Sequence, residues 1–253
     1  MTGSLTIVGL GPGSPELMTP AASSALCQAT DLVGYATYLA RVPIVEGQTR
    51  HASDNRVELD RARHALALAS EGRRVVVVSS GDPGVFAMAA AVFEAIESGE
   101  AAWRALDVRV EPGVTAMLAA AALAGAPLGG DFCAISLSDN LKSWDTIERR
   151  LQAAATADFV IALYNPASQS RPHQLTRTFE LLRQWKAGST IVLFVRAAGS
   201  TDARLNITTL AEASAAAADM RTMVIIGSST TRLITREGAI PSVYTPRSEI
   251  SRP

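Results

Sequence analysis

Cysteine is scarce in this sequence, which contains only Cys27 and Cys133, too few for the disulfide framework of a small secreted protein. Each lies in an apolar segment, so two reduced thiols are a better interpretation than the single disulfide that the count allows. No basic leader precedes the first apolar segment, Ser4–Val8. We therefore expect a cytoplasmic protein.

Long apolar runs and an excess of charge of one sign are also absent. The longest mildly apolar stretch, residues 114–126, is rich in alanine and too short to cross a bilayer. Lys and Arg number 23 against 24 for Asp and Glu, whereas a nucleic-acid-binding protein usually carries a basic excess. We expect neither a membrane nor a nucleic acid as a partner.

Apolar segments are short but frequent, and hydrophobic residues make up 48% of the 253 residues. The four consecutive valines in Arg74–Ser79 are typical of a strand buried on both faces. Strands are predicted at 5–8, 31–33, 74–79, 108–111, 132–137, 159–164, 190–195, 205–209 and 222–226. Helices are predicted at 20–29, 55–70, 87–97, 115–124, 143–155 and 173–186. This alternation predicts an α/β fold with mainly parallel sheets.

The segment Gly125–Gly130 is the best candidate for a linker, because it combines three glycines with a proline. The two halves do not repeat each other in sequence. We therefore predict two unlike α/β lobes, residues 1–125 and 131–253. After Gly238 the chain contains three prolines and is expected to form an extended tail.

Glycine-bearing loops follow three predicted strands of the first half, at residues 9–14, 80–85 and 112–116. Ligands of α/β sheets bind beyond the carboxyl ends of strands, so these loops are expected at one binding edge. The first loop is a poor dinucleotide fingerprint, because Ser14 replaces the third glycine and Pro12 lacks an amide donor. Any one loop is more often a structural turn. Three of them, each followed by a helix, favour a ligand site.

Four motifs taken together resemble the ordered motifs of the tetrapyrrole methylase family. They are Gly9-Leu10-Gly11-Pro12-Gly13, Ser80-Gly81-Asp82-Pro83, Pro112-Gly113-Val114-Thr115-Ala116 and Ile225-Ile226-Gly227, and the resemblance runs from residue 5 to about residue 233. It implies two unlike α/β lobes, S-adenosylmethionine folded in the cleft between them, and usually a homodimer.

The same resemblance implies a cofactor site of mostly small or apolar residues, which would hold the ligand through backbone hydrogen bonds and shape. The implied cofactor-binding residues are Pro12, Ser80, Gly81, Asp82, Val85, Thr115, Ala116, Tyr164, Asn165, Ala198 and Thr222.

Other segments resemble the branch of the family that acts in cobalamin synthesis, methylating a precorrin at C17 and contracting its ring. They are Gly34–Leu39, His51–Arg56, Ile135–Lys142, Tyr164–Pro166 and Gly227–Arg232. The Asp that usually follows a Tyr here in uroporphyrinogen-methylating members is absent, since Ala36 follows Tyr35. Another corrin-ring methylase, a nicotinamide-dependent oxidoreductase and a non-catalytic ligand-binding protein are the alternatives.

The implied chemistry needs no metal, because the enamine-like carbon is already nucleophilic, but ring contraction requires a base for a hydroxyl proton. His51 and Asp139 are the candidate catalytic residues, although a lone loop histidine is more often solvent-exposed. The tetrapyrrole substrate carries many carboxylates, which basic side chains should bind. The candidates for substrate binding are Arg41, Arg50, Arg56 and Lys142.

Overall fold

The computed structural model describes residues 3–54, 57–168, 171–238 and 240–248. The chain divides into two compact units, Met1–Thr115 and Ala116–Pro253. This division precedes the segment Gly125–Gly130 that was expected to join the lobes. The reason is that the helix α5 (Ala116–Ala124) packs against strands of the second unit, with Ala120 beside Val160 and Leu193 in one apolar cluster.

The first unit is built on a sheet of five strands in the order β3-β2-β4-β1-β5, and all of its pairings are parallel. The strands are β1 (Ser4–Gly9), β2 (Asp31–Tyr35), β3 (Thr49–Ser53), β4 (Arg74–Ser79) and β5 (Asp107–Glu111). The parallel sheet predicted from the sequence is confirmed for this unit.

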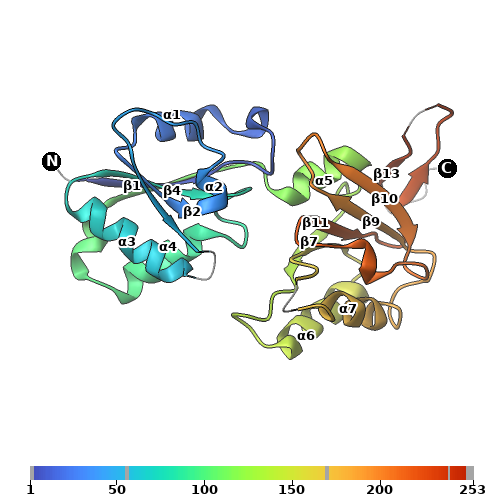
Figure 1. Cartoon of the computed structure of the whole chain (residues 1–253). Helices are drawn as coiled ribbons and strands as arrows, with labels where there is room; N and C mark the ends of the chain where they lie inside the picture. The colour runs from blue at the N-terminus through green and yellow to red at the C-terminus, as the bar shows by residue number, and fades with distance from the viewer. Residues whose placement is uncertain (1–2, 55–56, 169–170, 239, 249–253) are drawn as a thin grey trace. The chain divides into compact units, whose positions relative to one another are not determined.

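Helices cover both faces of this sheet (Figure 1). On one face Val75 and Val77 pack against α3 (Glu58–Ser70) and α4 (Met88–Ser98). On the other face Val76 and Val78 pack beside α1 (Pro20–Gln28) and the short α2 (Ala36–Leu39). The four valines thus face two cores, which explains their continuous apolar run.

The start of α1 follows from its sequence. The Thr19 hydroxyl accepts a hydrogen bond from the Ala22 amide at 3.1 Å, and Pro20 occupies the first helical position. The start of the helix predicted at residues 55–70 lies outside the described residues. That helix, α3, begins at Glu58.

The second unit contains a five-stranded sheet in the order β10-β9-β11-β8-β7, and here the prediction of a mainly parallel sheet is wrong. Only β7 and β8 pair in parallel, whereas the other three pairings are antiparallel. The strands are β7 (Phe132–Ser136), β8 (Val160–Tyr164), β9 (Ile191–Arg196), β10 (Arg204–Thr209) and β11 (Thr222–Ile226). A parallel connection needs a crossover, usually a helix, and the segment 197–203 between β9 and β10 is too short for one.

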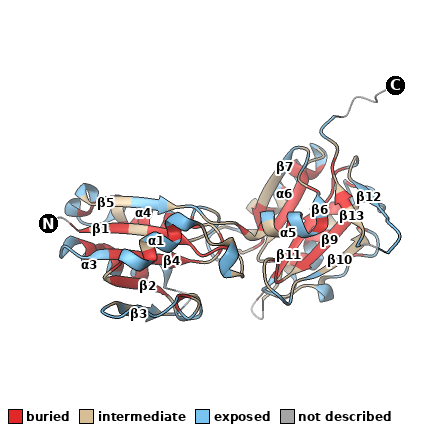
Figure 2. Cartoon of the chain, turned by 90° about the horizontal axis from the view of Figure 1, so that it is seen from above, coloured by how far each residue is buried: buried red, intermediate tan, exposed pale blue. Residues whose placement is uncertain are grey.

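Two apolar cores flank this second sheet. The helices α6 (Trp144–Thr156) and α7 (Gln174–Leu182) pack on one face, and α5 packs on the other (Figure 1). Strand residues of β9 and β11 are buried between these helices, as the red colour in Figure 2 shows. No helix within the described residues is long and apolar enough to cross a membrane.

A small third sheet takes one strand from the expected linker and one from the expected tail, and adds residues 232–234, which precede that tail. Its order is β12-β13-β6, formed by Arg232–Ile234, Ser242–Tyr244 and Gly125–Ala126. Val243 is fully buried in the same apolar cluster as α5, so β13 packs against the second unit's core. Short 3-10 helices complete the fold at Pro15–Leu17, Ala101–Ala105 and Ala215–Ala217.

Candidate functional site

The three glycine loops of the first unit meet at the carboxyl edge of its sheet. The Gly11 amide donates to the Gly81 carbonyl at 3.2 Å, and the Gly81 amide donates to the Gly11 carbonyl at 2.9 Å. A Cβ atom on Gly9 would lie 2.5 Å from the Gly81 oxygen, and one on Gly113 would lie 2.2 Å from it. The loops therefore touch backbone to backbone, which only glycine allows.

Asp82 joins two of these loops through its carboxylate. One oxygen accepts a hydrogen bond from the Gly84 amide at 2.8 Å, and the other accepts from the Gly113 amide at 3.0 Å. The side chain therefore braces the second loop against the third.

Arg41, expected to bind the substrate, holds the first two loops instead. Its Nη2 donates to the carbonyls of Leu10, Gly11 and Gly13 at 3.1, 3.1 and 3.2 Å. Its Nη1 donates to the Ser80 hydroxyl at 3.1 Å. Burial of the guanidinium lowers the pKa of Arg41. Every one of these partners is a neutral oxygen of a predicted cofactor loop.

The other predicted substrate cations differ in their surroundings. Arg50 donates to the carbonyls of Leu39, Val42 and Pro43 and so ties the end of α2 to β3. Arg56 lies outside the described residues. Lys142 follows β7, and its partial burial lowers the pKa of its ammonium, with a smaller contribution from Arg150.

His51 faces away from the glycine loops. Its Nε2 lies 2.8 Å from a carboxylate oxygen of Asp31, the first residue of β2, and Arg73 donates to the same oxygen at 3.1 Å. Its Nδ1 lies 3.2 Å from Nε2 of His64. Asp31 and Arg73 lie at the amino edge of a parallel sheet, opposite the edge where the loops meet. The geometry does not support His51 as the base.

In the second unit, the predicted cofactor residues gather at one edge of the sheet. Asn165 adopts a left-handed conformation with φ of 52°, and its side-chain amide donates to the Ser136 hydroxyl at 2.9 Å. The Tyr164 hydroxyl accepts from the Met117 amide at 3.3 Å. The antiparallel register of β8 and β11 brings Thr222 to this same edge.

Ala198 and Thr222 are both buried, at 6% and 5% exposure. Ala198 belongs to the apolar cluster of α5, and the Thr222 hydroxyl donates to Asp219 at 2.7 Å. Thr115 and Ala116, by contrast, stand on either side of the division between the units.

Asp139 lies on the loop after β7, where the Gln174 amide donates to its carboxylate at 3.1 Å. Two buried polar atoms have no hydrogen-bond partner among the described residues, Oε1 of the same Gln174 and Nε of Arg171. Sequence reasoning missed both residues, because they stand in an ordinary helix entry with no motif around them. Arg171 also contacts the site through the Asn165 carbonyl at 3.5 Å.

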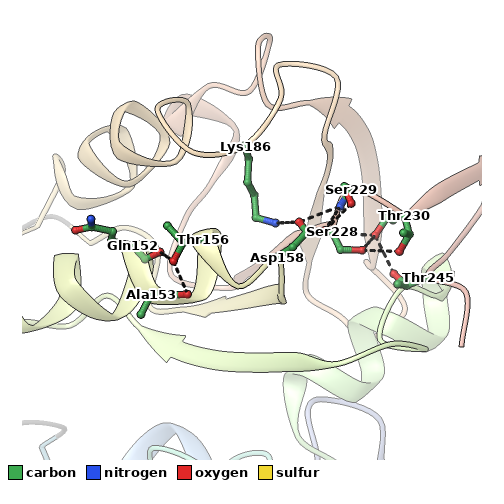
Figure 3. Close-up of polar contacts among 10 residues, drawn as sticks. Gln152, Ala153, Thr156, Asp158, Lys186, Ser228, Ser229, Thr230 and Thr245 are labelled. Carbon is green, nitrogen blue, oxygen red and sulfur yellow. Dashed lines mark hydrogen bonds and ion pairs between the residues drawn. The ribbon is translucent and has the colours of Figure 1, made fainter. Parts of the chain in front are cut away.

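One segment of the resemblance, Gly227–Arg232, lies at the opposite edge of the second sheet (Figure 3). There the amide and hydroxyl of Ser229 donate to the Asp158 carboxylate, which also accepts from the buried Lys186 ammonium at 2.8 Å. The Thr231 hydroxyl contacts that of Thr245 at 2.8 Å. This motif therefore anchors the third sheet.

Comparison with known proteins decides the family. A model of the tetrapyrrole (corrin/porphyrin) methylases matches residues 4–214. The chain belongs to the tetrapyrrole methylase family. Within the described residues, no group of three or more His, Cys, Asp or Glu side chains could hold a metal ion.

Relatives of this tetrapyrrole methylase include the precorrin-3B C(17)-methyltransferase of Sinorhizobium sp., which is 57% identical over 247 residues. The alignment covers 98% of this chain and 97% of the relative. The crystal structure of the methyltransferase CobJ is 54% identical with a TM-score of 0.92, covering 96% of this chain and 100% of that one. Uroporphyrin-III C-methyl transferase from Thermus thermophilus, complexed with S-adenyl homocysteine, is 25% identical with a TM-score of 0.68, covering 89% and 97%.

Proposed function

We propose that this protein transfers a methyl group from S-adenosylmethionine to C17 of precorrin-3B and contracts the macrocycle. The similarity to the Sinorhizobium enzyme over nearly the full length of both chains supports the substrate. The observation that carries the proposal in the structure is the meeting of Gly9, Gly81 and Gly113 at one sheet edge. The three loops at this edge would offer a ligand a surface of backbone groups rather than a charged pocket.

The residues at this edge fit a sulfonium cofactor. S-adenosylmethionine supplies an activated methyl group, and its sulfonium needs a shaped, water-poor environment more than a particular charged side chain. In the first unit Pro12, the main chain of Ser80–Val85 and Thr115 would hold it. In the second unit Ala116, Tyr164, Asn165, Ala198 and Thr222 would do so. Thr222 and Ala198 are buried.

Asp139 is the proposed general base for ring contraction. The Gln174 amide orients its carboxylate, and the two side chains share a loop edge with Asn165 and Arg171. The carboxylate would take the proton of the substrate hydroxyl as the neighbouring carbon–carbon bond migrates. Lys142 and Arg56 remain the proposed contacts for the substrate carboxylates.

We further propose that the protein acts in the cytoplasm as a homodimer, with no nucleic acid or membrane as partner. The family resemblance supports the dimer, and the balanced charge supports the absence of a polyanionic partner. Light scattering coupled to gel filtration tests the dimer, because a monomeric mass at working concentration would contradict it.

Calorimetry tests the cofactor assignment. The wild-type protein should bind S-adenosylhomocysteine and show no heat with NAD, because the first loop lacks the third glycine and one amide donor of a dinucleotide site. Tight NAD binding without a response to S-adenosylhomocysteine would overturn the proposal.

A further inference from the structure

The side chain of Arg41 joins the first glycine loop to the Ser80 hydroxyl. It comes from the turn that follows α2, and its two terminal nitrogens make four hydrogen bonds. Three acceptors are carbonyls of the first loop, and the fourth is Ser80 of the second. We propose that Arg41 is a positioning residue that shapes the two cofactor loops and does not bind the tetrapyrrole.

The rigidity of the peptide unit explains how this contact acts at a distance. A peptide bond is planar, so fixing a carbonyl also fixes the amide on its other side. The Leu10 carbonyl shares its plane with the Gly11 amide, which donates to Gly81. The Gly13 carbonyl shares its plane with the Ser14 amide. Because Arg41 binds three carbonyls of the first loop, it fixes the orientation of the peptide planes in the part of the loop proposed to face the ligand.

The chemistry of the contact also argues against a substrate role. An arginine recognises a carboxylate through a fork of two nitrogens. Both terminal nitrogens of Arg41 already bind neutral protein oxygens, and the guanidinium is partly buried among them. A lysine keeps the charge but has a single donor nitrogen, so it cannot reproduce contacts to both loops.

Arg50 supports this arrangement from the neighbouring strand. It donates to the carbonyls of Leu39 and Val42, which stand on either side of the turn that carries Arg41. The Arg50 side chain therefore holds the turn in place, so the Arg41 guanidinium reaches the loops from a defined position.

The test compares Arg41→Met and Arg41→Lys with the wild type, and it rests on the proposed function. Arg183→Met is the matched control, because Arg183 also binds two main-chain carbonyls, of Leu210 and Ala213, outside the proposed site. We expect Arg41→Met to bind S-adenosylhomocysteine about ten- to hundredfold more weakly, as for the loss of hydrogen bonds from a charged donor. Arg183→Met should change stability without changing that affinity.

Steady-state kinetics separates positioning from a merely structural effect. In Arg41→Lys, which keeps the charge and is the variant more certain to fold, KM for S-adenosylmethionine should rise at least severalfold. Its kcat at saturating cofactor and its KM for the tetrapyrrole should stay within about twofold of the wild type.

Two outcomes would overturn the inference. One is normal S-adenosylhomocysteine binding by both Arg41 variants with a raised KM for the tetrapyrrole, which would make Arg41 a substrate contact. The other is full recovery of cofactor affinity in Arg41→Lys, which would make charge sufficient. Failure of the wild type itself to bind S-adenosylhomocysteine would instead contradict the proposed function.

Discussion

At Gly113 a single methyl group would collide with two other loops. An added Cβ would lie 2.2 Å from the Gly81 oxygen and 2.9 Å from Cα of Gly9. Both neighbours are backbone atoms, which cannot relieve the clash by a change of side-chain rotamer. We expect Gly113→Ala to lower the free energy of unfolding by about 1–3 kcal/mol, the range for overpacking. It should also weaken S-adenosylhomocysteine binding, because the loops must separate.

Urea unfolding and calorimetry measure the two effects. Gly188→Ala is the control, since its added Cβ would meet only the Ala211 side chain at 3.3 Å. A Gly113→Ala protein with wild-type stability and wild-type affinity would show that the close approach of the loops does not matter.

Asp139 carries the second prediction at the residue scale. Asp139→Asn keeps the shape of the side chain and removes its basicity, so both ligands should still bind. The rate of formation of contracted product should fall about 10²–10⁴-fold, the usual cost of losing a general base. Asp145→Asn, a change at an acidic residue in the first turn of α6, serves as the control.

The product distribution makes this test specific. A methylated but uncontracted product from Asp139→Asn would separate the two steps and support the assignment. Contracted product at nearly the wild-type rate would show that the proton leaves by another route.

Among the elements, the turn between α6 and β8 depends on Asp158. Its carboxylate accepts from Lys186, whose side chain is only 3% exposed, and from Ser229 beyond β11 (Figure 3). Asp158→Asn retains the left-handed conformation, at φ of 55°, that asparagine also tolerates. The change therefore leaves a buried ammonium without its counterion.

We expect Asp158→Asn to cost about 2–3 kcal/mol, less than the loss of a fully buried partner because the Asp158 side chain is 42% exposed. Asp107→Asn is the matched control. Its ion pair with Arg109 is exposed on both sides, and losing it should cost clearly less than the loss at Asp158. Equal losses measured by urea unfolding would contradict the role of the buried ammonium.

The same carboxylate predicts a pH dependence. Burial raises the pKa of Asp158, but hydrogen bonds from Lys186 and Ser229 outweigh it and hold the pKa below its usual value. The stability from this group is therefore present above about pH 4 and is lost as the pH falls through the lowered pKa. Asp158→Asn should lose less stability than the wild type between about pH 5 and pH 3.

The first sheet was predictable from the sequence, since local signals suffice for parallel strands. The valines of β4 mark a strand with two covered faces, and Thr19 with Pro20 marks the start of α1. Polar β3 was missed because it lacks apolar alternation, and it lies at the edge of the sheet (Figure 2) with exposed and partly buried residues. In the second sheet, the short segment 197–203 indicates the antiparallel pairing of β9 with β10. The pairs that β11 makes with β8 and β9 join strands distant in sequence, which no local pattern reveals.

The candidate site was predictable in its loops but not in its side chains. The positions after β1, β4 and β5 follow from the rule for parallel sheets, and the structure brings these loops together. Which way a long side chain turns depends on partners distant in sequence. His51 turns to Asp31, and Arg41 turns to the first glycine loop.

For the whole molecule, the proposed cofactor residues divide between the two units, from Pro12 to Thr115 and from Ala116 to Thr222. We expect S-adenosylhomocysteine to slow amide hydrogen exchange in both units, at residues 80–85 and at residues 164–165. Ligand binding stabilises the elements that it contacts. Protection confined to the first unit would contradict the assignment of Tyr164 and Asn165.

The most direct test of the account is the product of a single reaction. The purified protein is incubated with precorrin-3B and S-adenosylmethionine bearing an isotopically labelled methyl group, and the product is analysed by mass, by nuclear magnetic resonance and by its absorption spectrum. The account predicts one added methyl group, labelled at C17, on a contracted macrocycle, together with S-adenosylhomocysteine. A label at another ring carbon, or no methyl transfer by protein that binds S-adenosylhomocysteine, would contradict it.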